Sequence, residues 1–217
     1  MPELVEFFEL AGIPVHWGRW GRTGSRKLRE DFLVVLEGSL ATLWDALPWG
    51  RPVGILSGGA YVPPPHPPRH SLGTAFDLSG LQFEDDRGLW CWELWHKHRA
   101  EPKEALAIEA HLRRHHAQVL GPWCNKDHED HWHIDDREDA RGYSERHPSD
   151  VRFLQAALHH VWGIDCGGID GIVGPRTLTA AHTALDQIRV GGLLTSSAVW
   201  DAFLAATVLG GLGLVEG

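Results

Sequence analysis

Two short blocks rich in histidine and aspartate constrain the fold of this chain more than any other feature. The blocks are residues 67–80 and 127–135. In the first block, six residues separate His70 from Asp77. In the second, one residue separates His131 from His133, and on a strand two residues so spaced point to the same side. A fold that joins the blocks gives two histidines and a carboxylate facing one point, the ligand pattern of a catalytic zinc with an open fourth position.

The histidine and cysteine contents favour a catalytic metal site over a structural one. The chain has 15 histidines, and neutral imidazole is the commonest metal ligand. Its three cysteines lie far apart without a Cys-x-x-Cys pair, which argues against a disulfide framework and against a cysteine-based zinc site. Closed structural zinc sites usually include cysteines and four protein ligands. The alternatives to metal catalysis are a structural or degenerate zinc site and a chance occurrence of the blocks.

Together the two blocks resemble the zinc peptidases of the D-alanyl-D-alanine carboxypeptidase and LAS group. This group includes extensin-like C-terminal domains and phage L-alanyl-D-glutamate endopeptidases. Its pattern is S-x-H-x-x-G-x-A-x-D, followed later by an acid and H-x-H; here it reads PRHSLGTAFD from Pro68 to Asp77 and DHWH from Asp130 to His133. The resemblance implies that His70, Asp77 and His133 are zinc ligands. It also implies a hedgehog/DD-peptidase-like domain, with a small antiparallel sheet and flanking helices.

The same resemblance suggests residues for proton transfer and substrate binding. The group's acid three residues before the last ligand falls on Asp130, our first choice for the base that activates water and protonates the leaving amine. His131 would then stabilise the oxyanion or share the proton, and the opposite assignment stays open. A substrate carboxylate usually needs a bidentate arginine, for which Arg51 and Arg69 are the upstream candidates. Pro68 replaces the family's serine, so the contact of that serine is not carried over.

The spacing of apolar residues predicts an α+β fold for the first part of the chain. Two segments have helical spacing, about Arg26 to Leu47 and about Pro102 to Leu120. Between them, Val53 to Val62 and Ala75 to Leu81 read as short strands, and the segment 89–95 fits either a strand or a helix. Short strands with flanking helices, without regular βαβ alternation, are typical of an α+β domain.

A polar, turn-prone segment near residues 141–150 divides the chain, and three helices are predicted after it. Here the sequence resembles the small three-helix peptidoglycan-binding domain. The matching residues are Val151, Leu154, Gln155, Leu158, Asp170, Gly171, Gly174, Thr177 and Ala181. Asp170, Gly171 and Gly174 suit the turn before Pro175, so the matches are mostly structural and reveal no binding surface. The third helix, about Thr195 to Leu209, is unusually apolar and is expected to lie in a core or against the first domain.

The two resemblances together predict a function. We expect a zinc peptidase domain over residues 1–142 and a peptidoglycan-binding helical domain over residues 149–217. A wall anchor beside a zinc peptidase points to hydrolysis of a stem-peptide or cross-link amide bond in peptidoglycan. The enzyme would be an L-alanyl-D-glutamate endopeptidase or a D,D-carboxy- or endopeptidase. The alternatives are a non-catalytic zinc-containing wall-binding protein and a zinc peptidase that acts on soluble peptides.

The net charge and the length of the apolar runs limit the classes of partner that we expect. A formal net charge of −9 gains nothing from the counterion release that drives nucleic-acid binding, so we expect no nucleic-acid partner. The longest apolar run, Val199 to Val215, is interrupted by Asp201 and glycines and falls short of the about 20 residues that span a bilayer, so no stable membrane insertion is expected. No N-terminal signal is visible. We expect a monomer that stays in the cytoplasm until another protein releases it to the wall, or a chain whose signal was removed.

Overall fold

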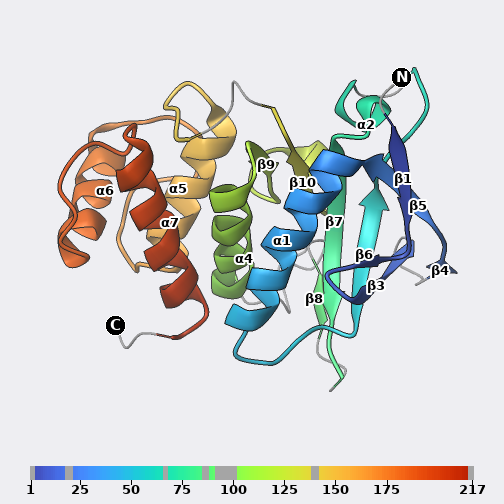
Figure 1. The fold of residues 1–217 in the computed structure, drawn as a ribbon. Coiled ribbons are helices and arrows are strands. Elements are labelled where there is room, and N and C mark those ends of the chain that lie inside the picture. The colour runs from blue at the N-terminus through green and yellow to red at the C-terminus, as the bar shows by residue number, and fades with distance from the viewer. Residues whose placement is uncertain are drawn as a thin grey trace.

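A mixed sheet with helices on one face forms the first part of the protein (Figure 1). The computed structural model describes residues 3–17, 22–65, 68–84, 88–90, 102–137 and 142–214. The larger sheet has the strand order β2-β3-β6-β7-β10-β9, with β4 beside β3 and β8 beside β7. Only β3 and β6 run parallel among these described pairs. The strands are β2 Glu9–Leu10, β3 Ile13–Trp17, β4 Arg22–Thr23, β6 Gly54–Gly59, β7 Ala75–Gln82, β8 Gly88–Trp90, β9 Gln118–Leu120 and β10 Trp132–Asp135.

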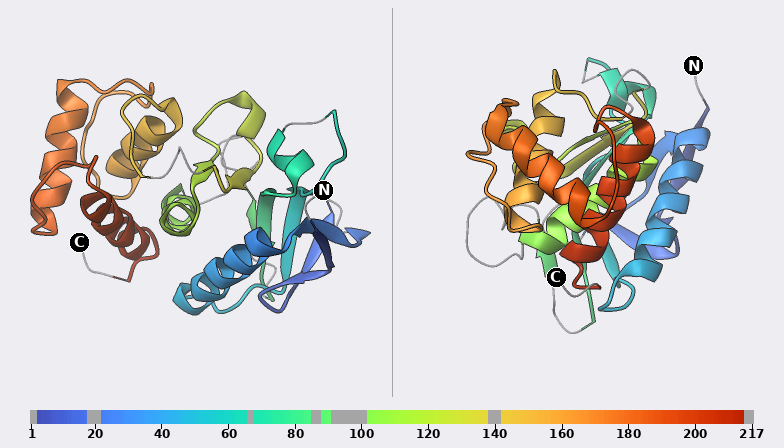
Figure 2. Two further views of the ribbon diagram at one scale, coloured as in Figure 1. Left: turned by 45° about the horizontal axis from the view of Figure 1, so that its top comes forward. Right: turned by 90° about the vertical axis from the view of Figure 1, so that its left-hand side faces the viewer.

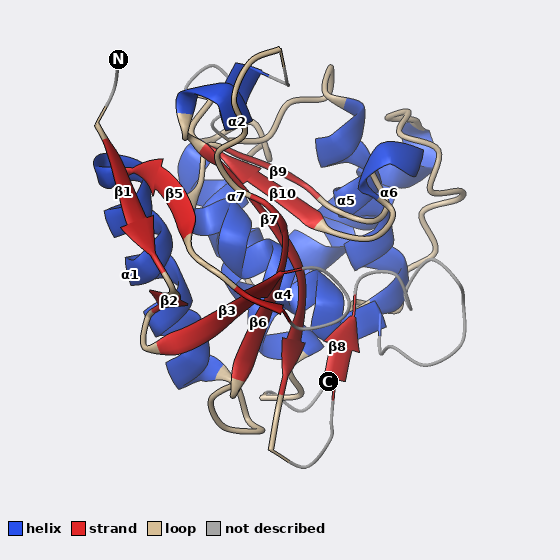
Figure 3. Cartoon of the chain, turned by 90° about the vertical axis from the view of Figure 1, so that its right-hand side faces the viewer, coloured by secondary structure: helices blue, strands red, loops and turns tan. Residues whose placement is uncertain are grey.

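Two long helices, α1 (Glu30–Ala46) and α4 (Pro102–His115), lie on one face of this sheet, and Figure 3 shows the other face toward the viewer. A short helix, α2 (Pro68–Leu72), lies above the start of β7, and a 3-10 turn, η1 (Lys126–His128), precedes β10. The predicted α+β class is confirmed. The strand predicted at Ala75 to Leu81 is observed, and of the segment 89–95 only its first two residues, in β8, lie among the described residues.

Both long helices are shorter than predicted, and strand pairing is the reason. The first begins at Glu30, because Arg26–Arg29 forms β5 and pairs antiparallel with β1 (Leu4–Phe7) in a separate two-stranded sheet. Burial in β5 alternates from residue to residue, which is the period of a strand. The second helix ends at His115, because Gln118–Leu120 forms β9 and pairs with β10.

Alternation along β7 and β10 separates the core from the candidate site. Phe76 and Leu78 of β7, and Trp132 and Ile134 of β10, are fully buried in the hydrophobic core. The residues between them point to the opposite face of the sheet, since successive side chains of a strand alternate. Polar side chains are thus placed on the sheet face away from α1 and α4, beside strands that the core holds in register.

Three helices follow residue 142: α5 (Pro148–His160), α6 (Pro175–Gln187) and α7 (Ser197–Gly211). Gln155 of α5 ties the turn before α6, since its side chain donates to Asp170 Oδ1 at 2.9 Å and accepts from the Gly171 amide at 2.9 Å. Gly171 has a φ of +80°, a conformation that suits glycine. These contacts give Gln155, Asp170 and Gly171 a structural role in the turn.

Of these three helices, α5 and α7 pack against α4, which lies between them and the sheet, and α6 packs against α5 (Figure 2). A Cβ on Gly211 of α7 would lie 2.5 Å from the carbonyl oxygen of Lys103, so the two helices touch backbone to backbone. The guanidinium of Arg113 is buried between the carboxylates of Glu109 and Asp150, each at 2.9 Å. The expectation that the apolar third helix packs against the first part of the chain is confirmed. None of the helices that the structure describes combines the length and apolar character needed to cross a bilayer.

Candidate metal centre

The candidate centre is built on two cross-strand partners, Asp77 of β7 and His133 of β10. Residues directly opposite each other on antiparallel strands point to the same face. His133 Nδ1 lies 2.9 Å from Asp77 Oδ1. Both side chains are on the sheet face away from α1 and α4, and both are largely buried. The strand pairing that the core imposes therefore joins the two sequence blocks.

His70 reaches the same point from α2. Its Nδ1 lies 2.6 Å from the carbonyl oxygen of Ala60, which can only accept, so Nδ1 carries the proton. The other ring nitrogen, Nε2, lies 3.3 Å from Asp77 Oδ2. Gly73, with a φ of +72°, ends the helix and donates its amide to the His70 carbonyl at 3.0 Å. The turn thereby fixes the backbone that carries His70.

Gly59 of β6 allows these groups to meet. A Cβ at this position would lie 2.5 Å from Asp77 Oδ2 and 3.4 Å from His70 Cε1. Side chains at Cβ essentially never approach a neighbour at the shorter of these distances. The carboxylate of Asp77 therefore occupies space that any residue other than glycine would fill.

Asp135 holds the far side of the His133 ring. Its Oδ2 lies 3.2 Å from His133 Nε2, and its side chain is only 2% exposed. The other oxygen accepts the backbone amide of Arg137 at 2.8 Å, which fixes the carboxylate. A carboxylate on the outer nitrogen of a histidine is the usual support of a metal ligand, because it sets the tautomer and ring orientation.

The protonation of the centre follows from these contacts. Burial disfavours the charged form of Asp77, but hydrogen bonds from His133 and His70 outweigh it and hold the pKa of this carboxyl well below its usual range. Burial likewise opposes the charge of His133, but its hydrogen bonds to Asp135 and Asp77 raise its pKa to about 9. A metal cation between His133 and Asp77 would take the place of the Nδ1 proton.

The donor set fits zinc. One ligand atom from each of His70, Asp77 and His133 lies within 4.8 Å of the other two. Two imidazoles and one carboxylate suit zinc, and three protein ligands leave a position for water or substrate. The geometry establishes a group able to bind a metal ion.

Asp130 and His131 form a pair at the edge of the centre. His131 Nδ1 lies 2.8 Å from Asp130 Oδ1, while His131 Nε2 lies 3.6 Å from Asp77 Oδ1. The Asp130 side chain is 64% exposed and that of His131 is 17% exposed. Of the two, His131 is the residue that faces the metal ligands, and Asp130 holds its outer nitrogen.

The two candidate substrate arginines lie in different places. Arg69 precedes His70 in α2, and its guanidinium contacts Asp136 Oδ1 at 3.4 Å. Arg29 contacts the other oxygen of Asp136 at 2.8 Å. Arg51 precedes β6 and lies beyond its first residue, Gly54, whereas Gly59 is its last residue. The strand alone spans about 16 Å, so the structure does not bring Arg51 to the centre.

Sequence reasoning assigned no role to His128 or Asp135, although both lie in the second block. His128 is at the end of η1, and its ring centroid lies 5.3 Å from that of His131 and 5.8 Å from that of His133. Burial, together with the nearby His131 and His133, lowers its pKa to about 4. The signal for Asp135 was available, because residues two apart on a strand share a face. His128 depends on the turn before the strand, which no periodicity reveals.

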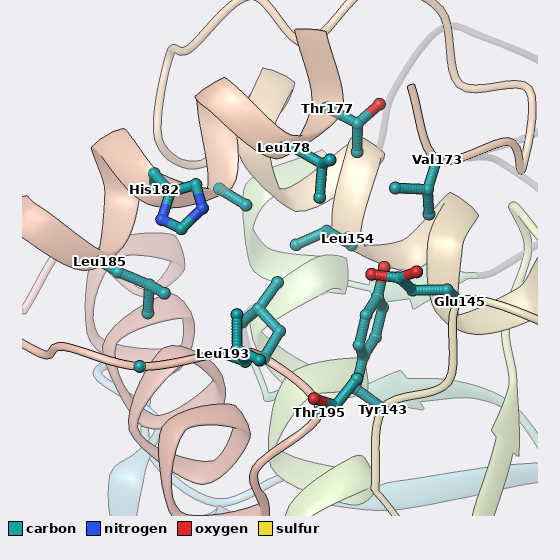
Figure 4. Close-up of a pocket in the computed structure, with 13 residues that line it drawn as sticks. Tyr143, Glu145, Leu154, Val173, Thr177, Leu178, His182, Leu185, Leu193 and Thr195 are labelled. Carbon is teal, nitrogen blue, oxygen red and sulfur yellow. The ribbon is translucent and has the colours of Figure 1, made fainter. Parts of the chain in front are cut away.

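A separate cavity of about 170 Å³ lies in the C-terminal helical part (Figure 4). Its walls are mostly apolar, and polar groups of Glu145, His182 and Thr195 lie around it. None of the lining residues belongs to the metal centre. The lining residues are Tyr143, Glu145, Leu154, Val173, Thr177, Leu178, Ala181, His182, Leu185, Gly192, Leu193, Leu194 and Thr195.

Comparison with known proteins gives one family likeness. Residues 66–144 match the family described as "Extensin-like protein C-terminus". The matched range contains both sequence blocks and ends before α5. Searches of curated proteins and of solved structures gave no match.

Proposed function

We propose that this protein is a zinc-dependent peptidase that hydrolyses an amide bond in the stem peptides or cross-links of bacterial peptidoglycan. The observation that carries the proposal is the convergence of His70 Nε2, Asp77 and His133 Nδ1, with an outer acceptor fixing each ring. Zinc in this position would polarise the scissile carbonyl and lower the pKa of a water molecule. The extensin-like match over the same residues supports the choice of centre.

His131 supplies the proton transfer that amide hydrolysis requires. With Nδ1 donating to Asp130 Oδ1, Nε2 carries the lone pair that faces the centre. It accepts a proton from the attacking water and returns it to the leaving amine. Asp130 acts through His131 as a positioning residue. The sequence favoured Asp130 as the base, whereas this geometry favours the reversed assignment that the sequence left open.

The cavity in the helical part is our candidate for attachment to the wall. Its apolar walls suit the alkyl portions of a stem peptide, and the Glu145 carboxylate suits a free amino group there. The helical module would then hold the peptidase at its insoluble substrate. This role separates the leading proposal from a zinc peptidase that acts on soluble peptides.

Digestion of purified peptidoglycan tests the activity. The protein is incubated with zinc or with a chelator, and the released fragments are identified by mass, which also names the bond. We expect cleavage with zinc and none with the chelator or with His133→Ala. Cleavage that survives the chelator would overturn the mechanism, and no cleavage by the zinc-loaded protein would favour the non-catalytic wall-binding alternative.

A further inference from the structure

The metal centre contains one histidine more than the proposed chemistry uses. His128 faces His131 and His133, and one ligand atom from each of these three residues lies within 4.8 Å of the other two. This second group shares only His133 with the group formed by His70, Asp77 and His133. The two groups are therefore neighbours on the same sheet face.

The four histidines of the centre share one arrangement, in which an oxygen outside the cluster holds one ring nitrogen and leaves the other for the interior. The contacts are His70 Nδ1 to Ala60 O at 2.6 Å, His128 Nδ1 to Asn125 Oδ1 at 2.8 Å, His131 Nδ1 to Asp130 Oδ1 at 2.8 Å and His133 Nε2 to Asp135 Oδ2 at 3.2 Å. This is how proteins prepare histidines as metal ligands.

The orientation of His128 is fixed by a second contact. Asn125 Oδ1 also accepts the backbone amide of Asp127 at 2.9 Å. An amide N–H can only donate, so the oxygen of Asn125 is the atom that faces the ring, and His128 Nδ1 must donate to it. The remaining atom, Nε2, is then unprotonated and offers its lone pair.

A single zinc leaves donors unused. With His70, Asp77 and His133 as its three protein ligands, Nε2 of His128 and Nε2 of His131 stay free. Asp77 can serve both sides, because its Oδ2 lies 3.3 Å from His70 Nε2, and its Oδ1, which is 2.9 Å from His133 Nδ1, also lies 3.6 Å from His131 Nε2. A carboxylate between two metal positions is a common feature of two-metal hydrolytic sites.

We infer that His128 and His131, together with Oδ1 of Asp77, form a second zinc site beside the first. It binds more weakly, because it has only two ligands of its own. The consequence of this second site rests on the proposed function: excess zinc inhibits the peptidase. With Nε2 of His131 engaged by a second ion, His131 can no longer exchange a proton with the substrate.

Metal stoichiometry tests the inference without any assay of activity. The full-length protein is dialysed against increasing zinc, and bound metal is counted by elemental analysis, with cobalt absorption as a second readout. The wild type is expected to bind one equivalent more than His128→Gln. His159→Gln, which removes an exposed histidine outside the cluster, should bind as the wild type does. Circular dichroism checks that each variant is folded.

Two results would overturn the second site: equal zinc binding by wild type and His128→Gln, or an unchanged count in His131→Gln. In the wall-digestion assay, activity should rise and then fall with zinc, and His128→Gln should shift the inhibitory concentration upward by about tenfold or more. Failure of wall cleavage would sink the proposed function while the metal count still decides the second site.

Discussion

Asp77 and His133 lie directly opposite each other on neighbouring antiparallel strands, with Nδ1 2.9 Å from Oδ1. A shift of this pairing by one residue would turn one of the two side chains into the hydrophobic core. The buried apolar residues of the two strands, among them Phe76 and Trp132, oppose such a shift, because it would turn them out of the core. The proposed ligand set is thus maintained by the same apolar residues that hold the sheet on its helices.

The first prediction concerns Gly59. In Gly59→Ala the new methyl group would lie 2.5 Å from Asp77 Oδ2, so the carboxylate must move. We expect zinc affinity to fall by about 10- to 100-fold, as for other changes in the support of a metal ligand. Gly58→Ala on the same strand is the matched control, since its Cβ meets only the movable Ser79 hydroxyl at 3.0 Å and Asp77 Cβ at 3.5 Å. Equal affinities of the two variants, measured by competition with a chromophoric chelator, would contradict this account.

The second prediction concerns Asp135. Asp135→Asn keeps the shape of the side chain but replaces the carboxylate that holds His133 Nε2. Zinc affinity should fall by about 10- to 100-fold with the fold retained. Asp136→Asn is the control, because Asp136 pairs with Arg29 and Arg69 instead of the histidine. A larger loss of zinc in the control would show that His133 does not depend on Asp135.

The third prediction separates His131 from Asp130. With one equivalent of zinc bound, His131→Gln should lower kcat by about 100-fold or more, since it removes the proton carrier. Asp130→Asn should lower kcat less, because the ring that it holds remains. Steady-state kinetics on purified peptidoglycan fragments gives both values. An inactive Asp130→Asn beside an active His131→Gln would return the base role to Asp130.

The fourth prediction concerns stability and pH. Burial is the main reason that the pKa of His111 falls from 6.5 to about 4; His115 and Arg114 add to it, and the bond to the Ser39 carbonyl opposes it. The unfolded chain therefore binds this proton first as the pH drops. The contribution of neutral His111 to the free energy of unfolding is complete above about pH 6.5. It is lost progressively down to about pH 4, to a total of about 3 kcal/mol.

Urea unfolding at pH 7, 5.5 and 4.5 measures this effect. His111→Gln should lose less free energy of unfolding than the wild type over that range, since glutamine does not titrate. His159→Gln should follow the wild type, because His159 is exposed. Parallel curves for all three proteins would show that His111 is not the group responsible.

The fifth prediction tests the cavity of the helical part. Leu193 and Ile172 are both 68% exposed, but only Leu193 lines the cavity. Leu193→Glu should therefore reduce sedimentation with purified cell walls, while Ile172→Glu should leave it unchanged. Hydrolysis of soluble muropeptides by both variants should match the wild type. Equal wall binding by the two variants would remove the cavity from the attachment role.

Much of the centre could be predicted because its spacing is local. Six residues between His70 and Asp77, and one between His131 and His133, suffice to expect a metal site once the blocks meet. The α+β class also follows from local patterns of apolar residues. His128 could not be assigned in this way, because its place is decided by the η1 turn and its contact with Asn125.

The helix ends were missed because long-range pairing decides them. Arg26–Arg29 has apolar spacing compatible with a helix, but β1 supplies strand partners that lie far away in the sequence. Gln118–Leu120 likewise does not extend α4, because it forms a strand that pairs with β10, where Val119 lies opposite Ile134. The cavity around Leu193 arises from packing of the 143–145 segment on α6 and the loop that follows it, which no local pattern encodes.

The close packing of α7 on α4, with Gly211 against the backbone of Lys103, sets the distance between the helical part and the sheet. A peptidase on a flexible linker would search a volume set by the length of that linker. Here the cavity and the metal centre keep one separation and one relative orientation. A molecule held at the wall by its helices would therefore make its cuts at a constant distance from the point of attachment.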